Sequence, residues 1–159
     1  MGEMELRWRW KDFDDLDTRE LYDILALRQE VFVVEQSCPY PDIDGEDAAA
    51  WHLLGGMERH GGRLGAYLRV LPAGTRYAET SIGRVVVRPE LRGRETGRAL
   101  MREGLRYIAE RAGGEVPVRV EAQAHLEAFY RGLGFETVSD PYEVDGIPHV
   151  QMLRTLRGS

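Results

Sequence analysis

Apolar and polar residues in the first half of the chain recur first with the period of a strand and then with that of a helix. Residues 5–10 read ELRWRW, in which apolar and charged residues alternate, and this predicts a half-buried strand. Asp17 and Glu20 have the spacing of a capping box, and the apolar residues after them recur at helical intervals as far as Phe32. The next elements predicted are a proline- and acid-rich loop at 37–47 and two strands at 51–57 and 64–71, joined by a turn at 60–62.

The second half is organised around a strand, a helix and a further strand. Residues 81–87 are apolar and β-branched, which predicts a strand buried on both faces. A helix is predicted over 96–112, ended by Gly113, and a strand over 116–122. The remaining elements predicted are a short helix at 126–133 and strands at 136–138 and 150–156, on either side of the turn VDGIP. This order is typical of a mixed α/β protein.

Composition narrows the class of protein. A chain of 159 residues suits one domain, 1–159, and 43% hydrophobic with 30% charged residues is the balance of a globular protein. No apolar run approaches a membrane span and no signal peptide is recognised, so we expect a cytoplasmic protein without membrane contact. The net charge of -6 argues against nucleic-acid binding. Cys38 is the only cysteine, and no His, Asp or Glu set has ligand spacing, so no metal is expected.

The segment LRGRETGRALM, residues 91–101, joins the predicted strand 81–87 to the next helix and has the features of an anion site. A helix N-terminus offers free N–H groups and a partial positive charge. Gly93 and Gly97 permit close approach of a ligand to the backbone, and the segment also carries three arginines. From these residues alone, tight packing of the turn is an equally good interpretation. The spacing fits neither a P-loop nor a dinucleotide motif.

A longer pattern favours the anion site. The run VxPELRGxxxGxxLM from Val87, followed by FYxxLGF from Phe129, resembles the GNAT family of acetyl-CoA-dependent N-acetyltransferases. The segments LRQEVFVVEQSCPYPDIDGED, AQAHLEAFY and DGIPHVQM resemble its ElaA-type subgroup. The resemblance implies a single-domain α/β fold whose mixed central sheet, of about six to seven strands flanked by helices, splays at the cofactor-binding strand.

The resemblance also implies the cofactor, acetyl-CoA, and the residues that hold it. The pyrophosphate of coenzyme A is expected on the loop and helix start, and its arm along the strand end. The cofactor-binding residues are then Val85, Val86, Val87, Arg92, Gly93, Arg94, Glu95, Thr96, Gly97, Arg98, Phe129 and Tyr130. Glu95 stands where the family loop has its first glycine, so we expect its carboxylate to face solvent or pair with an arginine. Its N–H group can donate to the cofactor if its backbone is helical.

The chemistry requires a neutral amine, a stabilised oxyanion and a proton for the leaving thiolate. Tyr130 matches the family tyrosine that protonates the thiolate, although an aromatic pair within a helix is also typical of core. A backbone N–H group of the 85–87 strand is expected to stabilise the oxyanion. His125 and His149 are the candidate bases, with a water chain as the alternative. His52 is expected to be structural and His60 to lie on the surface.

The acidic loop borders the acceptor site in proteins of this family, and an acidic rim attracts a cationic amine. For most of its acids, however, a solvated polar loop is the expected interpretation. Glu35 ends a helix, where a carboxylate is disfavoured, so it is expected to have a partner. Arg28 is the candidate for that partner, or it binds a carboxylate of the cofactor or substrate. Glu35 and Arg28 are therefore the expected substrate-binding residues.

The leading hypothesis is an enzyme that acetylates a primary amine of a small molecule or peptide by direct attack in a ternary complex. One alternative is a degenerate acyl-CoA-binding sensor or assembly module without turnover. Another is an acyltransferase with longer acyl donors, suggested by the autoinducer-synthase-like pattern of Arg28, Val31 and Phe32. A homodimer stays open as the assembly.

Overall fold

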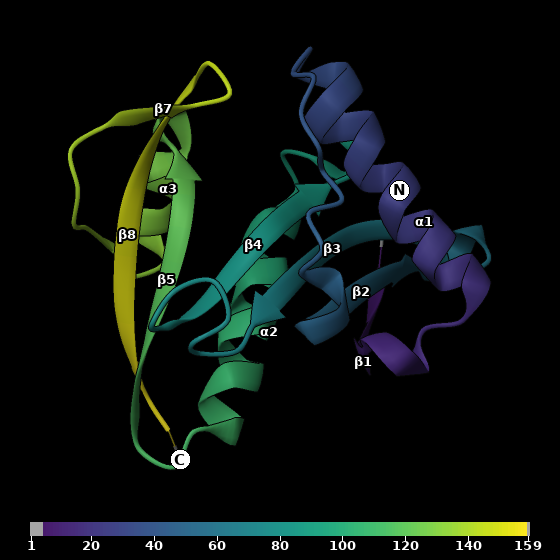
Figure 1. Cartoon of the computed structure of the whole chain (residues 1–159). Helices are drawn as coiled ribbons and strands as arrows, with labels where there is room; N and C mark the ends of the chain where they lie inside the picture. Colours follow the sequence, from purple (N-terminus) through teal and green to yellow (C-terminus); the bar gives the residue numbers. More distant parts are fainter. Residues whose placement is uncertain (1–4, 159) are drawn as a thin grey trace.

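A computed structural model describes residues 5–158 and shows one mixed β-sheet with helices on both faces (Figure 1). Eight strands form the sheet in the order β1-β2-β3-β4-β5-β8-β6, and β7 pairs with β8. In chain order the elements are β1 (Leu6–Asp12), α1 (Thr18–Arg28), β2 (Trp51–Met57), β3 (Arg63–Leu71), β4 (Thr80–Val87), α2 (Thr96–Arg111), β5 (Glu115–Gln123), α3 (Glu127–Gly132), β6 (Glu136–Thr137), β7 (Tyr142–Val144) and β8 (Ile147–Arg157).

The predicted fold class is confirmed, with one strand more than expected. The added strand, β7, lies in the tail, where the sequence suggested only a turn. Asp145 and Gly146, both with positive φ, reverse the chain so that β7 pairs antiparallel with the start of β8. In the part of the chain that the structure describes, no helix has the length and apolar character needed to cross a membrane.

The first helix differs from its prediction in the second half of its length. It is α-helical only as far as Arg28, and residues Gln29–Glu35 continue as a π-helix. Apolar spacing does not distinguish the two, because both place side chains on one face over a few residues. The wider turns of the π-helix bring Val31 and Phe32 to the edge of the cleft described below.

The two faces of the sheet bury different helices. Ile24 and Leu27 of α1 pack against one face, in a cluster that includes Tyr67 of β3. Leu100 and Leu105 of α2 belong to the larger cluster on the opposite face. Successive residues of β3 supply both layers because side chains alternate along a strand. The sheet is therefore the middle of three layers.

The sheet splays between β4 and β5, as the sequence suggested. These parallel strands pair only at Thr80–Val118 and Ser81–Arg119 and diverge beyond that point (Figure 1). On its other side β4 keeps antiparallel pairing with β3, but the register shifts so that Arg84 and Val85 lie opposite Leu68. This bulge, with Arg84 at φ 51°, turns the end of β4 away from regular pairing and opens a cleft in the sheet.

A capping box fixes where α1 begins. Asp17 accepts a hydrogen bond from the Glu20 N–H group at 2.7 Å, and the Glu20 side chain accepts from the Asp17 N–H group at 2.9 Å. Glu20 also pairs with Arg9 at 2.8 Å and Lys11 at 3.2 Å, both on β1. The cap therefore ties the helix to the sheet edge as well as closing its first turn.

Replacing Asp17 with alanine should lower the stability of the protein by about 1 kcal/mol, because one helix N–H group loses its acceptor. In thermal unfolding this corresponds to a fall in Tm of about 3 °C for a chain of this size. Asp14→Ala is the matched control, since Asp14 is exposed in the preceding 3-10 turn. Equal shifts for the two variants would contradict the capping role.

Candidate functional site

The cleft between β4 and β5 continues into a cavity of about 930 Å³, a volume typical of small-ligand sites. Its walls come from the π-helix, the 37–47 loop, the diverging ends of β4 and β5, the start of α3 and the β7–β8 turn. The lining residues used below are Glu35, Cys38, Asp44, Arg69, Arg76, Arg84, Val85, Val86, Val87, Arg92, Glu121, His125, Tyr130 and His149.

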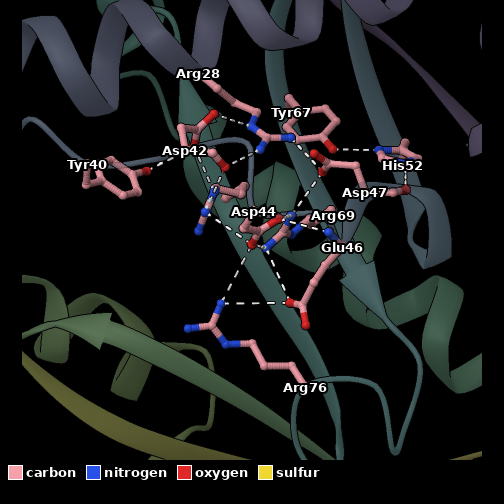
Figure 2. Close-up of polar contacts among 11 residues, drawn as sticks. Arg28, Tyr40, Asp42, Asp44, Glu46, Asp47, His52, Tyr67, Arg69 and Arg76 are labelled. Carbon is pink, nitrogen blue, oxygen red and sulfur yellow. Dashed lines mark hydrogen bonds and ion pairs between the residues drawn. The ribbon is translucent and has the colours of Figure 1, made fainter.

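The acidic loop is held against the sheet by buried arginines (Figure 2). Arg28 donates from Nε to Asp42 at 2.9 Å and from Nη1 to Asp47 at 2.7 Å. Arg69 of β3 binds Asp44 through both Nη atoms, at 2.5 and 2.9 Å, and Asp47 at 3.0 Å. The expectation of a mainly solvated loop is therefore wrong for Asp42 and Asp47, which are only 7% and 8% exposed.

Burial makes these ion pairs interdependent. A charge removed from water is tolerated only when its partners replace the lost hydration. Burial alone would raise the pKa of Asp44, but the hydrogen bonds and charge of Arg69 hold that pKa well below its usual range. Arg84 adds a contact of 2.8 Å to Asp42 from the bulge of β4. The loop is thus fastened to α1, β3 and β4 at once.

His52 supports the same loop from behind, in the structural role expected for it. One ring nitrogen lies 2.6 Å from the Tyr67 hydroxyl and the other 2.9 Å from the Asp47 carbonyl oxygen. Burial lowers the pKa of His52, so the neutral ring is favoured. His60 is exposed in a turn, also as expected.

The expected pairing of Glu35 with Arg28 is wrong. Arg28 has no exposed surface and does not line the cavity, so it positions the loop and cannot reach a substrate in this conformation. Glu35 instead accepts two hydrogen bonds from Arg92, at 2.5 and 2.9 Å. Arg92 also donates from Nε to the Val87 carbonyl oxygen at 3.1 Å. The pair therefore joins the π-helix to the turn after β4.

The turn before α2 has the geometry of an anion cradle. Gly93 and Glu95 have φ of 75° and 63°, and the first α-helical backbone bond runs from the Ala99 N–H group to the Glu95 carbonyl oxygen. The N–H groups of the first turn precede that bond and have no intrahelical acceptor. A Cβ at Gly97 would stand 3.6 Å from the Phe129 ring. These features fit a pyrophosphate held by the backbone.

Glu95 meets one expectation and fails another. Its carboxylate pairs with Arg98 at 3.0 Å and is 79% exposed, as expected of a charge that must avoid phosphates. Its backbone is left-handed instead of helical, a conformation that favours glycine. Glu95 therefore keeps the turn that a glycine would make, at a cost of about 1 kcal/mol. Thr96 closes the turn with a hydrogen bond to the Leu91 carbonyl oxygen at 3.0 Å, while Arg94 is exposed.

Tyr130 combines the two interpretations offered by the sequence. Its ring packs edge-on against Phe129 and Phe135 and is 6% exposed, as in a core residue. It also lines the cavity. Burial raises the pKa of Tyr130 to about 12, so its hydroxyl is protonated at neutral pH and can donate.

Both candidate bases line the cavity, and their geometry differs. His149 lies on β8 with Nδ1 at 2.7 Å from the Ile147 carbonyl oxygen. A carbonyl only accepts, so Nδ1 carries the hydrogen and the neutral ring keeps its Nε2 lone pair. His125 is exposed in the short turn before α3. The hydrogen bond gives His149 a defined tautomer with a basic nitrogen.

The sequence did not identify two polar residues of the cavity, Arg76 and Glu121, or the side chains that hold Glu121 in place. Glu121 of β5 accepts from the Tyr142 hydroxyl at 2.6 Å and lies 3.5 Å from Arg76. Gln151 of β8 donates to Glu121 at 3.3 Å. Because side chains alternate along a strand, the sequence can show that these residues share one face of the sheet. It cannot show that this part of the face is open, because that depends on where β4 and β5 diverge. Among residues 5–158, no three His, Cys, Asp or Glu side chains are arranged to hold a metal ion.

Comparisons with known proteins agree with this geometry. A family model described as the acetyltransferase (GNAT) domain matches residues 65–156, more than half of the chain. ElaA of Escherichia coli is 41% identical over 151 residues, which cover 94% of this chain and 96% of that protein. The crystal structure of ElaA matches with a TM-score of 0.85 and covers 94% of this chain and 99% of its own.

Two further solved structures share the fold. An acyl-CoA N-acyltransferase from Pseudomonas aeruginosa is 43% identical, with a TM-score of 0.86 and coverage of 94% of this chain and 99% of that one. An aminoglycoside 6′-N-acetyltransferase complexed with coenzyme A has a TM-score of 0.68 at 16% identity, covering 92% and 96%, and shows likeness of fold alone. The match to the family model and the close relationship to ElaA place this chain in the GNAT family of acyltransferases.

Proposed function

We propose that the chain is a cytoplasmic, acetyl-CoA-dependent N-acetyltransferase that acetylates a primary amine of a small molecule or peptide in a ternary complex. The observation that carries the proposal is one cavity that is lined by the end of β4 beyond its pairing with β5, by Tyr130 and by His149. In the proposed mechanism, this cavity would bring together the acyl donor, a proton source and a base. The Pseudomonas relative, named an acyl-CoA N-acyltransferase, supports the reaction class.

The donor side is formed by backbone. The N–H groups of residues 93–98 would hold the pyrophosphate, with Arg92 and Arg98 nearby, and Val85, Val86 and Val87 would pair with the pantetheine arm. Bound acetyl-CoA supplies the activated acyl thioester. The bulge at Arg84 and Val85 leaves strand N–H groups that can donate to the oxyanion formed when the amine attacks.

The acceptor side supplies the proton transfers. His149 would take a proton from the ammonium through Nε2, directly or through water, because Nδ1 is committed to Ile147. Tyr130 would donate to the departing thiolate from the inner wall of the cavity. The raised pKa of Tyr130 keeps the donor proton in place until charge develops on the sulfur.

The degenerate-module alternative rests on Glu95 alone. The Glu95 carboxylate is turned outward to Arg98, so the substitution does not block the cradle. An acyltransferase with longer donors stays as the second candidate, because Leu71, Ile82 and Phe32 give the cavity an apolar part. A comparison of acetyl-CoA with octanoyl-CoA as donors for one amine separates the two enzymes.

Coenzyme A should raise the Tm of the protein, since a ligand that binds only the native state stabilises it. Thermal unfolding with and without millimolar coenzyme A measures this effect, and no shift in Tm would contradict the cofactor assignment.

Glu95→Gln should bind coenzyme A about two- to fivefold more tightly, because one exposed negative charge near the phosphates is removed. Glu110→Gln is the matched control, an exposed acid at the other end of α2 that pairs with Arg106 as Glu95 pairs with Arg98. Calorimetric titration measures the affinity of both variants for coenzyme A.

Tyr130→Phe should lower turnover by about 10²–10⁴-fold while leaving coenzyme A affinity nearly unchanged, because the ring packing survives and only the proton donor is lost. Steady-state kinetics and direct cofactor titration separate the two effects. Tyr22→Phe serves as control, since Tyr22 is 74% exposed on α1. Turnover equal to that of the control, with chemistry rate-limiting, would remove Tyr130 from the mechanism.

His149→Gln should reduce kcat/KM by about 10²–10⁴-fold for an alkylamine, which is protonated at neutral pH and needs a base. The loss should be much smaller for an aniline, which is already neutral. His60→Gln provides the exposed control, and His125→Gln tests the other candidate. A loss of the same size for both kinds of amine would assign His149 to structure, and a loss confined to His125→Gln would reassign the base.

A further inference from the structure

Arg76 is the most loosely held cation of the arginine–carboxylate cluster (Figure 2). Its Nη1 lies 3.9 Å from both Asp44 and Glu46, and its Nη2 lies 3.5 Å from Glu121. Arg69, by comparison, reaches Asp44 at 2.5 Å. The Arg76 side chain is 38% exposed, against 2% for Arg69. Arg76 therefore occupies the cavity side of the cluster without forming the close contacts of the inner arginines.

The charge of the cluster is not balanced. The cluster contains five carboxylates and three closely held arginines, so it carries two net negative charges before Arg76 is counted. Arg76 offsets one of these two negative charges. The acids are Asp42, Asp44, Glu46, Asp47 and Glu121, and the closely held arginines are Arg28, Arg69 and Arg84. Asp44 and Glu121 line the cavity, so this excess favours a further cation over an anion there.

One acceptor in the cluster is also left open. Glu46 Oε2 is enclosed and has no hydrogen-bond partner among the described residues. Its nearest cations, Arg76 and Arg69, are 3.9 and 4.0 Å away, beyond hydrogen-bond distance. An enclosed carboxylate oxygen without a donor is costly. A cation that replaced Arg76 and brought an N–H group to hydrogen-bond distance of Glu46 Oε2 would satisfy it.

We propose that Asp44 and Glu121 on the cavity wall, with Glu46 next to Arg76, form a cation subsite of the acceptor cavity, which Arg76 fills when no substrate is bound. This inference rests on the proposed function and names its acceptor class: a primary amine with a second cationic group, guanidinium or ammonium. Asp44, Arg76 and Glu121 line the same cavity as His149 and Tyr130, so one end of the acceptor is anchored while the other reacts. In its present position Arg76 also lies over the Tyr77 ring, with Cζ 5.6 Å from the ring centroid.

Calorimetric titration of the coenzyme A-bound protein tests the subsite without turnover. The probes are 4-aminobutylguanidine, 1-aminobutane and 4-aminobutanoate, which share a chain but carry a cationic, neutral or anionic tail. The guanidine should bind about tenfold or more tightly than 1-aminobutane, an effect of partly enclosed charges. Arg76→Ala should tighten guanidine binding about three- to tenfold by removing the competitor, and Glu121→Gln should weaken it. Arg19→Ala, on the exposed side of α1, should change nothing.

Three results would overturn the subsite: equal affinity for the guanidine and 1-aminobutane, preference for 4-aminobutanoate, or weaker guanidine binding in Arg76→Ala. The last two would make Arg76 an anchor for an anionic acceptor. Failure of the proposed function is distinct, because it would appear as absence of thiol release from acetyl-CoA with every amine while guanidine binding and its response to Arg76→Ala persist.

Discussion

Strands β4 and β5 share only two residue pairs, and the rest of the site follows from where that pairing stops. Backbone N–H and C=O groups inside a sheet normally satisfy each other, so diverging strands leave a row of them without partners. On the other edge of β4, the bulge opposite Leu68 also interrupts the pairing with β3. The cleft therefore leaves main-chain groups without sheet partners in an otherwise regular sheet, and the turn after β4 leads from it into α2.

Charged side chains form the opposite wall of the cleft. The 37–47 loop has little regular structure, and its position depends on Arg28, Arg69 and Arg84, which come from three different elements. Removing one partner would leave a buried ion uncompensated, which costs several kcal/mol. The loop is thus held by a network whose members need each other, and ion pairs fix this wall of the cavity beside the hydrophobic cluster of α1.

Local patterns in the sequence were enough for the fold but not for this wall. The capping box at Asp17, the alternation in β1 and the apolar run of β4 each record a local constraint, and each element was found close to its predicted place. The turn at 91–101 was singled out by its glycines, arginines and helix start. The family motif then favoured an anion site there and a catalytic role for Tyr130, and both roles stay predictions. The partners of Arg28 lie 14 and 19 residues away in a segment without periodicity, so no local pattern could assign them. The left-handed backbone at Arg84 also has no sequence signal, because arginine rarely adopts it.

The proposed donor and acceptor sides have opposite electrostatic requirements within a chain of net charge -6. On the proposed donor side, phosphates would be attracted by the helix dipole and backbone N–H groups, which keep their partial charge whatever the surrounding side chains are. The acid in this turn, Glu95, has a left-handed backbone, and its exposed carboxylate pairs with Arg98. On the proposed acceptor side, the last arginine stays 3.5 Å or more from the carboxylates, which leaves an excess of negative charge for a cation. A donor with phosphates would be repelled by that excess, and a cationic acceptor would be repelled by the helix start. In the proposed mechanism, charge would therefore keep the two substrates on different sides of the site.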